Sequence, residues 1–171
     1  MNRRHSSKAG FTLVELMIVI GIISTLMGLV VFIYPKIQNM LNKTETNNNL
    51  HLLQQALIKY KSKRTVLPRD TEYESGVVNN DHLFEALETY GVEEKMMKDA
   101  WGRPVFYDRL KDIDGGFEIG RDLPENPLVS EFPSDTLSED QERRLDMWSF
   151  VIWSLGPEED NIADNMELRG K

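Results

Sequence analysis

The N-terminal part of the chain is dominated by one uninterrupted apolar run. From Phe11 to Ile33 the only charged residue is Glu15. At about 1.5 Å per residue this run spans about 34 Å as a helix, enough to cross a hydrocarbon core of about 30 Å. The run ends at Tyr34-Pro35-Lys36 without a small-residue cleavage site, which argues against a secretory signal peptide. The pattern predicts a membrane-spanning helix at residues 11–35.

Beyond this span, apolar side chains continue at helical spacing. They recur at Ile37, Leu41, Leu50, Leu53, Leu57 and Tyr60. A proline inside a helix is tolerated as a kink, so Pro35 does not require the helix to end there. We therefore expect one long, bent helix that reaches about Lys61. The stretch Asn42–Asn49 is poor in helix formers and is expected to loosen where nothing packs on it.

The middle of the chain predicts one short amphipathic helix. Asp81 is a favourable N-cap for the sequence HLFEALETY, and Gly91 stands where a helix C-cap is expected. The helix should therefore cover residues 82–90, with its leucines and phenylalanine in the core.

The second half changes to short aromatic and β-branched segments bounded by Gly, Pro and Asp. These segments are PVFY at 104–107, GFEI at 116–119 and WSFVIWSL at 148–155, and they predict a three-stranded antiparallel sheet. Residues 122–147 carry three prolines and a capping-box pattern from Ser138 to Gln141, which opens a short helix to about Asp146. We expect this segment to be an insertion on the surface. The predicted fold class is α+β, a long N-terminal helix packed against a small three-stranded sheet.

Charge and cysteine content narrow the function. The net charge is −8, and three cations, Arg3, Arg4 and Lys8, precede the apolar run, so the rest of the chain is more acidic still. Nucleic acid is therefore not expected as a partner. The same three cations outnumber Lys36 and Lys43 after the span, which predicts a cytoplasmic N-terminus. The chain has no cysteine, so neither a disulfide nor a thiolate metal site is available.

The sequence carries no constellation typical of an enzyme. It has no Gly-x-Ser-x-Gly, no Gly-rich phosphate loop and no His-Glu-x-x-His, and His5, His51 and His82 are scattered singly. Tryptophans in short strands are more typical of a core than of a ligand groove. We therefore do not expect catalysis.

The stretch GFTLVELMIVIGIISTLMGLVV, at residues 10–31, resembles the N-terminus of type IV pilin-like proteins. A basic leader, residues 1–10, ends in glycine, phenylalanine follows, and Glu15 stands fifth after the glycine. The resemblance implies that an inner-membrane prepilin peptidase cuts between Gly10 and Phe11 and methylates the new amine on Phe11. It also implies that Glu15 pairs with the N-terminal amine of a neighbouring subunit as the helices pack into a filament core.

Two downstream segments narrow the resemblance to the major pseudopilin of type II secretion systems. DAWGRPVFY at 99–107 and SLGPEEDNIADNMELRG at 154–170 are similar, in order, to that family's Asp-Pro-Trp-Gly and Ser-Leu-Gly-Pro segments. The resemblance implies a single-pass protein of the bacterial inner membrane, with residues 36–171 forming a periplasmic, pilin-like domain. The resemblance also implies that the protein polymerises into a periplasmic filament that drives protein export. The implied partners are further copies, minor pseudopilins and the inner-membrane secretion platform.

The acidic tail is a candidate calcium site. Hard oxygens gather at Glu158, Glu159, Asp160, Asn161, Asp164 and Asn165, although runs of acidic residues are more often only solvated. The resemblance implies calcium ligands at the Leu155 carbonyl, Glu158 and Asp164, and we add Asp160 for its charge and proximity. The family's paired aspartates read Asp164-Asn165 here, so one expected ligand is neutral.

Two alternatives remain open. A surface type IV pilin would share the N-terminus, but the usual C-terminal cysteine pair is missing and the tail resembles the pseudopilin calcium loop. A single-pass anchor that carries a binding or enzymatic ectodomain would not be processed at Gly10. The intact mass of the cellular protein separates this last alternative from the others.

Overall fold

The computed structural model describes residues 11–64, 66–111, 117–133, 136–157 and 166–171. They belong to two compact units, one that ends at Met40 and one that runs from Leu41 to Lys171.

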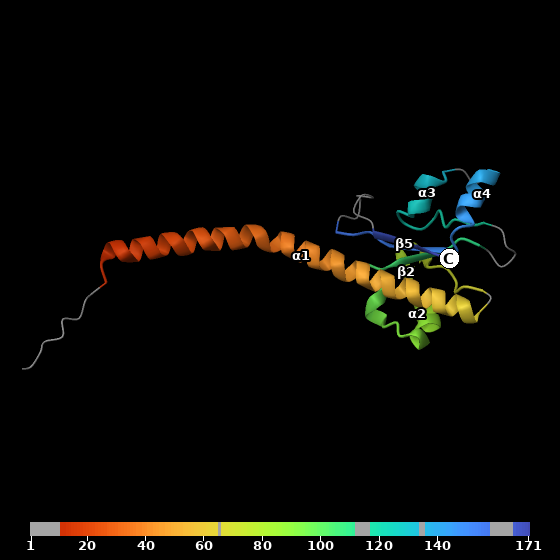
Figure 1. The fold of residues 1–171 in the computed structure, drawn as a ribbon, viewed down its shortest axis with the longest axis horizontal. Helices are drawn as coiled ribbons and strands as arrows, with labels where there is room; N and C mark the ends of the chain where they lie inside the picture. The colour runs from red at the N-terminus through yellow and green to blue at the C-terminus, as the bar shows by residue number, and fades with distance from the viewer. Residues whose placement is uncertain (1–10, 65, 112–116, 134–135, 158–165) are drawn as a thin grey trace, which may run out of the picture. The chain divides into compact units, whose positions relative to one another are not determined.

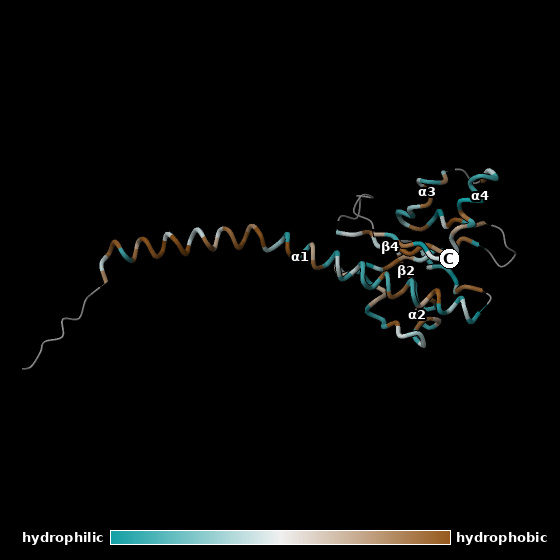
Figure 2. Tube along the Cα trace, in the orientation of Figure 1, coloured by the Kyte–Doolittle hydropathy of each residue, from teal (hydrophilic) through white to brown (hydrophobic). Residues whose placement is uncertain are grey.

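The first unit is the N-terminal part of helix α1 (Leu13–Lys63), which continues through Pro35 as the sequence predicts (Figure 1). Every described residue up to Met40 is exposed, and Figure 2 shows an almost continuous hydrophobic colour along this part of the helix. In the described part of the chain, α1 is the one helix long and apolar enough to cross a membrane. These properties fit a membrane anchor.

The second unit begins with the rest of α1, which is amphipathic. One face of this part of the helix is buried, at Thr46, Leu50, Leu53, Ala56 and Leu57. The stretch Asn42–Asn49 is helical and does not loosen, because Thr46 and Leu50 are fully buried against the rest of the unit. Burial of these side chains provides the packing that stabilises a helix of weak intrinsic propensity.

A three-stranded antiparallel sheet packs on this part of α1. Its strands are β3 (Phe106–Arg109), β4 (Phe150–Ser154) and β5 (Met166–Gly170), in the order β3-β4-β5. Alternate side chains point to opposite faces. Tyr107, Phe150 and Ile152 join the leucines of α1 in one core, whereas Phe106, Val151 and Trp153 belong to a second core. This confirms the predicted α+β architecture.

The identity of the third strand was predicted wrongly. Phe117 forms only an isolated bridge with Lys111, and residues 118–119 are not in a strand, while β5 completes the sheet. β5 is an edge strand that is only partly buried and carries charged residues, so it lacks the apolar signature of an inner strand. It ends at Gly170, where a Cβ would lie 2.1 Å from Cζ of Phe150. The glycine therefore lets the edge strand close over the Phe150 ring.

A hairpin, one short helix and two 3-10 turns lie between α1 and β3. The elements are β1 (Glu72–Glu74), β2 (Val77–Asn79), α2 (Asp81–Leu87) and 3-10 turns at Glu88–Tyr90 and Glu94–Met97. The sequence analysis missed the hairpin, whose two-residue turn is Ser75-Gly76 at φ 52° and 84°. The short helix is confirmed as α2, followed directly by the 3-10 turn Glu88–Tyr90, which Gly91 closes at φ 88°. Asn80 rather than Asp81 occupies the N-cap position of α2.

Residues 122–147 cover the outer face of the sheet, away from α1. The segment contains α3 (Pro127–Glu131) and α4 (Glu139–Leu145), and the predicted capping box at Ser138 is confirmed. Among its described residues, the buried apolar side chains are those of Leu123, Leu128, Phe132 and Leu145, which pack in the second core with Trp153. The Trp153 indole Nε1 donates a hydrogen bond to the Pro124 carbonyl at 3.1 Å. This segment therefore does more than lie on the surface, because it shields an apolar sheet face from water.

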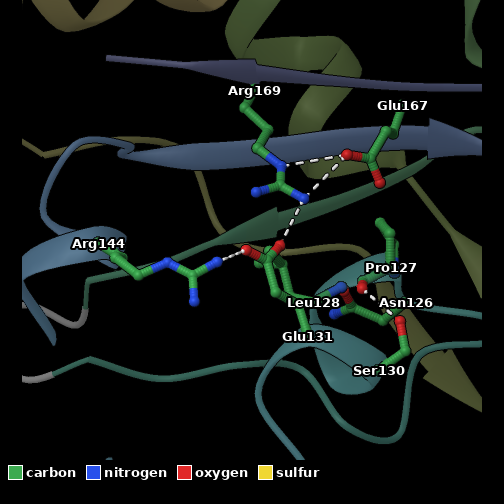
Figure 3. Close-up of polar contacts among 8 residues, drawn as sticks. All are labelled: Asn126, Pro127, Leu128, Ser130, Glu131, Arg144, Glu167 and Arg169. Carbon is green, nitrogen blue, oxygen red and sulfur yellow. Dashed lines mark hydrogen bonds and ion pairs between the residues drawn. The ribbon is translucent and has the colours of Figure 1, made fainter. Parts of the chain in front are cut away.

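A shared carboxylate links this segment to the sheet edge (Figure 3). Glu131, at the end of α3, pairs through one oxygen with Arg144 on α4 and through the other with Arg169 on β5, the latter at 2.8 Å. Arg169 also contacts Glu167 of its own strand at 3.0 Å. Glu131 thus connects the neighbouring helices α3 and α4 to β5, whose Arg169 lies 38 positions further along the chain.

Candidate functional site

The predicted processing and assembly residues lie at the start of α1. Gly10 lies outside the described residues, so the structure places only one side of the predicted cut. Phe11 is 77% exposed and precedes the helix. Glu15 lies in the first turn and is also exposed.

Thr12 and Glu15 form a reciprocal capping box that the sequence analysis missed. The Thr12 hydroxyl accepts a hydrogen bond from the Glu15 backbone N–H at 3.2 Å. In return, Glu15 Oε2 accepts from the Thr12 backbone N–H at 2.9 Å and from the Thr12 hydroxyl at 2.8 Å. The signal was present in the sequence, because Thr-x-x-Glu before an apolar run is a capping-box pattern. Glu15 therefore has a local role in capping the N-terminal end of α1, in addition to its charge.

This geometry uses the two carboxylate oxygens of Glu15 differently. Oε2 takes both donors from Thr12, and no donor among the described residues reaches Oε1. A carboxylate accepts hydrogen bonds on both oxygens, so Oε1 remains available to a further donor. An ammonium group of another molecule is a suitable donor, because a charge-assisted hydrogen bond is shorter and stronger than a neutral one.

The candidate calcium residues lie mostly outside the described part of the chain. Leu155 follows β4 directly and is 5% exposed, and Gly156 next to it has φ 70°. Glu158, Asp160 and Asp164 lie outside the described residues. Where the structure describes the chain, no group of three or more His, Cys, Asp or Glu side chains is arranged to hold a metal ion. The predicted site therefore stays a prediction.

A buried aspartate joins the two segments at residues 99–107 and 154–170. Asp99 is 5% exposed, and its Oδ1 accepts hydrogen bonds from the backbone N–H groups of Trp101 at 2.9 Å and Arg103 at 2.8 Å. Its Oδ2 accepts from the Ser154 hydroxyl at 2.8 Å, and that hydroxyl accepts from the Gly156 N–H at 3.2 Å. The 99–103 turn thus fixes the chain where it leaves β4 and enters the acidic tail.

A second buried aspartate holds the outer segment to β3. Asp108 is 2% exposed, and its Oδ2 accepts from the Gly120 N–H at 2.9 Å and from the Asn126 amide at 2.8 Å. Burial, with smaller contributions from the nearby Asp70 and Glu118, raises the pKa of Asp108 to about 7 against the lowering effect of these two hydrogen bonds. Asn126 also caps α3, since its side-chain oxygen accepts from the Leu128 N–H at 3.0 Å.

Comparison with known proteins identifies the N-terminal region. Residues 5–31 match the model of the prokaryotic N-terminal methylation motif. Searches of curated proteins and of solved structures found no match to the chain. The matched residues include Gly10, Phe11, Thr12 and Glu15, together with most of the apolar run. The chain therefore carries the N-terminal methylation motif of type IV pilin-like proteins.

Proposed function

We propose that this protein is a structural subunit of a type II secretion pseudopilus, without enzymatic activity. The observation that carries the proposal is the methylation motif at residues 5–31, joined to an exposed apolar helix and followed by an α+β unit. The choice of a pseudopilus over a surface pilus is supported by the segments at 99–107 and 154–170. The Asp99–Ser154 hydrogen bond connects these two segments directly.

In this proposal the precursor sits in the inner membrane with a cytoplasmic N-terminus. Cleavage after Gly10 by the prepilin peptidase creates a positive amine on Phe11, which is then methylated. Glu15 receives this amine from a neighbouring subunit as the helix leaves the bilayer. Two unit charges about 4 Å apart gain roughly 4 kcal/mol at an effective dielectric near 20, and desolvation offsets part of this gain. Such a pair fixes the register of neighbouring helices. Minor pseudopilins and the inner-membrane platform complete the assembly.

The processing step gives the first test. In cells that contain a prepilin peptidase, mass spectrometry of the membrane-extracted protein should show a chain that begins at methylated Phe11. Gly10→Val should block the cut, because glycine lets the backbone lie in the peptidase site without a side-chain clash and valine adds a bulky side chain there. Gly21→Val is the matched control, because a Cβ at Gly21 meets nothing within 4 Å. Recovery of the uncut chain starting at Met1 would contradict the proposal and favour a simple membrane anchor.

We further propose that the acidic tail binds calcium. The Leu155 carbonyl, Glu158, Asp160 and Asp164 would hold the ion, which prefers carboxylate and carbonyl oxygens. No Lys or Arg lies between Trp148 and Leu168, so a cation is needed to balance charges brought close together. Support comes from Leu155, which the Asp99 and Ser154 contacts hold beside the end of β4.

Calcium should therefore stabilise a soluble fragment that begins at Lys36. A ligand that binds only the folded state at a hundredfold excess over Kd adds about 2.7 kcal/mol to the free energy of unfolding. Calcium should raise the melting temperature by several degrees, and magnesium should raise it less because Mg²⁺ gives up its waters reluctantly. Asp164→Ala should reduce the gain more than the matched variant Glu159→Ala. Identical melting curves in calcium and in EGTA would show that the tail is only a solvated acidic surface.

A further inference from the structure

The end of α1 and the loop after it form a strongly basic cluster in an acidic protein. Residues 59–69 contain five cations and no acidic residue, whereas the whole chain has a net charge of −8. The basic cluster consists of Lys59, Lys61, Lys63, Arg64 and Arg69. The remainder of the protein is therefore even more acidic than the net charge indicates.

Two members of the basic cluster line an open hollow on the second unit. Arg64 and Arg69 line this hollow, whose volume is about 510 Å³, together with Tyr60, Pro68 and His82. The Arg64 guanidinium lies 5.4 Å from the centre of the Tyr60 ring. An aromatic face that holds a cation in this way leaves the N–H donors at the guanidinium edge free for a partner.

The cations of the basic cluster differ from most other cations of the described residues, which have acidic partners. The partnered cations include Lys95 with Glu93, Arg103 with Asp99, Arg109 with Asp70, Lys111 with Asp146, Arg143 with Glu139, and Arg144 and Arg169 with Glu131. Within the described ranges, no carboxylate forms an ion pair with a member of the basic cluster. Even Asp70, which follows Arg69 directly, faces Arg109 instead, at 4.0 Å.

The helix dipole alone does not account for this arrangement. Cations in the last turn of a helix interact favourably with its dipole, which accounts for Lys61 and Lys63. The effect fades within that turn and does not reach Arg69, which lies beyond the helix. It also gives no reason for the absence of acidic residues from 59–69 in a chain with 28 Asp and Glu.

We propose that the basic cluster docks on an acidic surface of a second copy of this chain. Charge complementarity supports this occupant, because every copy offers one basic cluster and a predominantly acidic remainder. A contact between two different surfaces of identical subunits is heterologous, so it repeats without closing and builds a filament unless a rotation makes a ring. The inference rests on the proposed filament and names one surface through which its subunits recognise each other.

Charge reversal tests the docking directly in the full-length chain. Filament yield should fall by about tenfold or more in Arg64→Glu/Arg69→Glu, since like charges placed across an interface cost several kcal/mol. The control is Lys98→Glu/Arg143→Glu, which changes the net charge equally at two exposed positions outside the cluster and should leave yield within about twofold. Normal cleavage and membrane levels of both variants would show that they fold and insert.

Cross-linking of the unmodified chain gives an independent measurement. Filaments grown from a mixture of isotopically light and heavy chains can be treated with a carbodiimide, which joins lysine amines to carboxylates in direct contact. Peptides that link Lys59, Lys61 or Lys63 of a light chain to a carboxylate of a heavy chain are expected. Filaments should also weaken in 1 M salt, where the Debye length falls to about 3 Å.

The outcomes separate this inference from the proposed function. Full filament yield from Arg64→Glu/Arg69→Glu, or cross-links of the cluster only within one chain, would overturn the docking surface and leave the filament intact. Failure of the unmodified chain to form filaments in cells with the secretion machinery would overturn the proposed function and this inference with it.

Discussion

Replacing Asp108 with asparagine is expected to stabilise the second unit at pH 8 and to change its stability little at pH 4. The pKa of Asp108 is about 7 in the folded protein, against an ordinary aspartate pKa of 3.8. A raised folded pKa means that the stability this group contributes is fully present below about pH 4 and is lost as the pH rises through about 7. A difference of about three pKa units corresponds to at most about 4 kcal/mol.

The substitution keeps the hydrogen bonds and removes the charge. An asparagine oxygen at position 108 can still accept from the Gly120 N–H and the Asn126 amide, as Asp108 Oδ2 does. Urea unfolding of the fragment that begins at Lys36, at pH 4, 6 and 8, measures the effect, because the two proteins differ only in the titration of Asp108 and in its coupling to Asp70 and Glu118. Asp140→Asn, at an exposed position in α4, is the control and should not alter the pH profile. Parallel pH profiles for Asp108→Asn and the parent would show that the Asp108 carboxylate is ionised without cost.

Replacing Glu15 is expected to abolish most filament assembly while leaving cleavage intact. The cut between Gly10 and Phe11 does not involve the Glu15 side chain in the proposed function, and removal of a charge favours the bilayer. The capping box, however, gives Glu15 a second role, because its carboxylate also satisfies the Thr12 N–H at 2.9 Å. A single Glu15→Ala variant therefore cannot separate the charge from the cap.

Two further variants make that separation. Glu15→Gln keeps a side-chain acceptor for the capping box but removes the charge, whereas Thr12→Val removes the capping hydroxyl and keeps the charge. If charge pairing drives assembly, Glu15→Gln should reduce filament yield as severely as Glu15→Ala. The expected loss is tenfold or more, since about 1.4 kcal/mol of lost pairing energy corresponds to a factor of ten. Thr12→Val should retain more filaments. Sheared filaments measured by immunoblot give the yield, and methylated Phe11 confirms processing in each variant.

The opposite ranking would assign Glu15 a purely local role. If Glu15→Gln assembles normally while Glu15→Ala and Thr12→Val fail, the capping box is what assembly requires, and the proposed pair with a neighbouring amine is wrong.

The elements with strong apolar patterns were predictable from the sequence, as was the polar helix α4 from its capping box, whereas the edge strand β5 and the short hairpin were not. The long helix follows from a run with one charge and from apolar spacing after Pro35, and its burial at Leu50, Leu53 and Leu57 confirms the expected face. The sequence analysis did not predict β5, because an edge strand with charged side chains has no apolar signature. The hairpin at Ser75-Gly76 was not predicted either, because each of its strands has only three residues, too few to show an alternation of apolar and polar side chains.

The candidate sites divide in the same way. Glu15 stood out because a lone charge in an apolar run is conspicuous, and the Thr12 cap was readable from local spacing. The roles of Asp99 and Asp108 were not readable. Asp99 meets Ser154 across 55 positions of the chain, and Asp108 meets Asn126 across 18, so their contacts exist only once the sheet has formed. No local pattern separates such a buried aspartate from an exposed one.

Because Arg144 and Arg169 share the Glu131 carboxylate, substitutions at these three positions should differ in how well the protein tolerates them. If Arg144 or Arg169 is replaced, the remaining arginine still has its acid, and the change costs one of two contacts. If Glu131 is replaced, Arg144 and Arg169 lose the carboxylate that they share, Arg169 keeps only its contact with Glu167, and the links from α3 to α4 and β5 through Glu131 are lost. Substitutions during evolution should therefore accumulate first at the arginines, and a change at Glu131 should be tolerated only after one arginine has already gone.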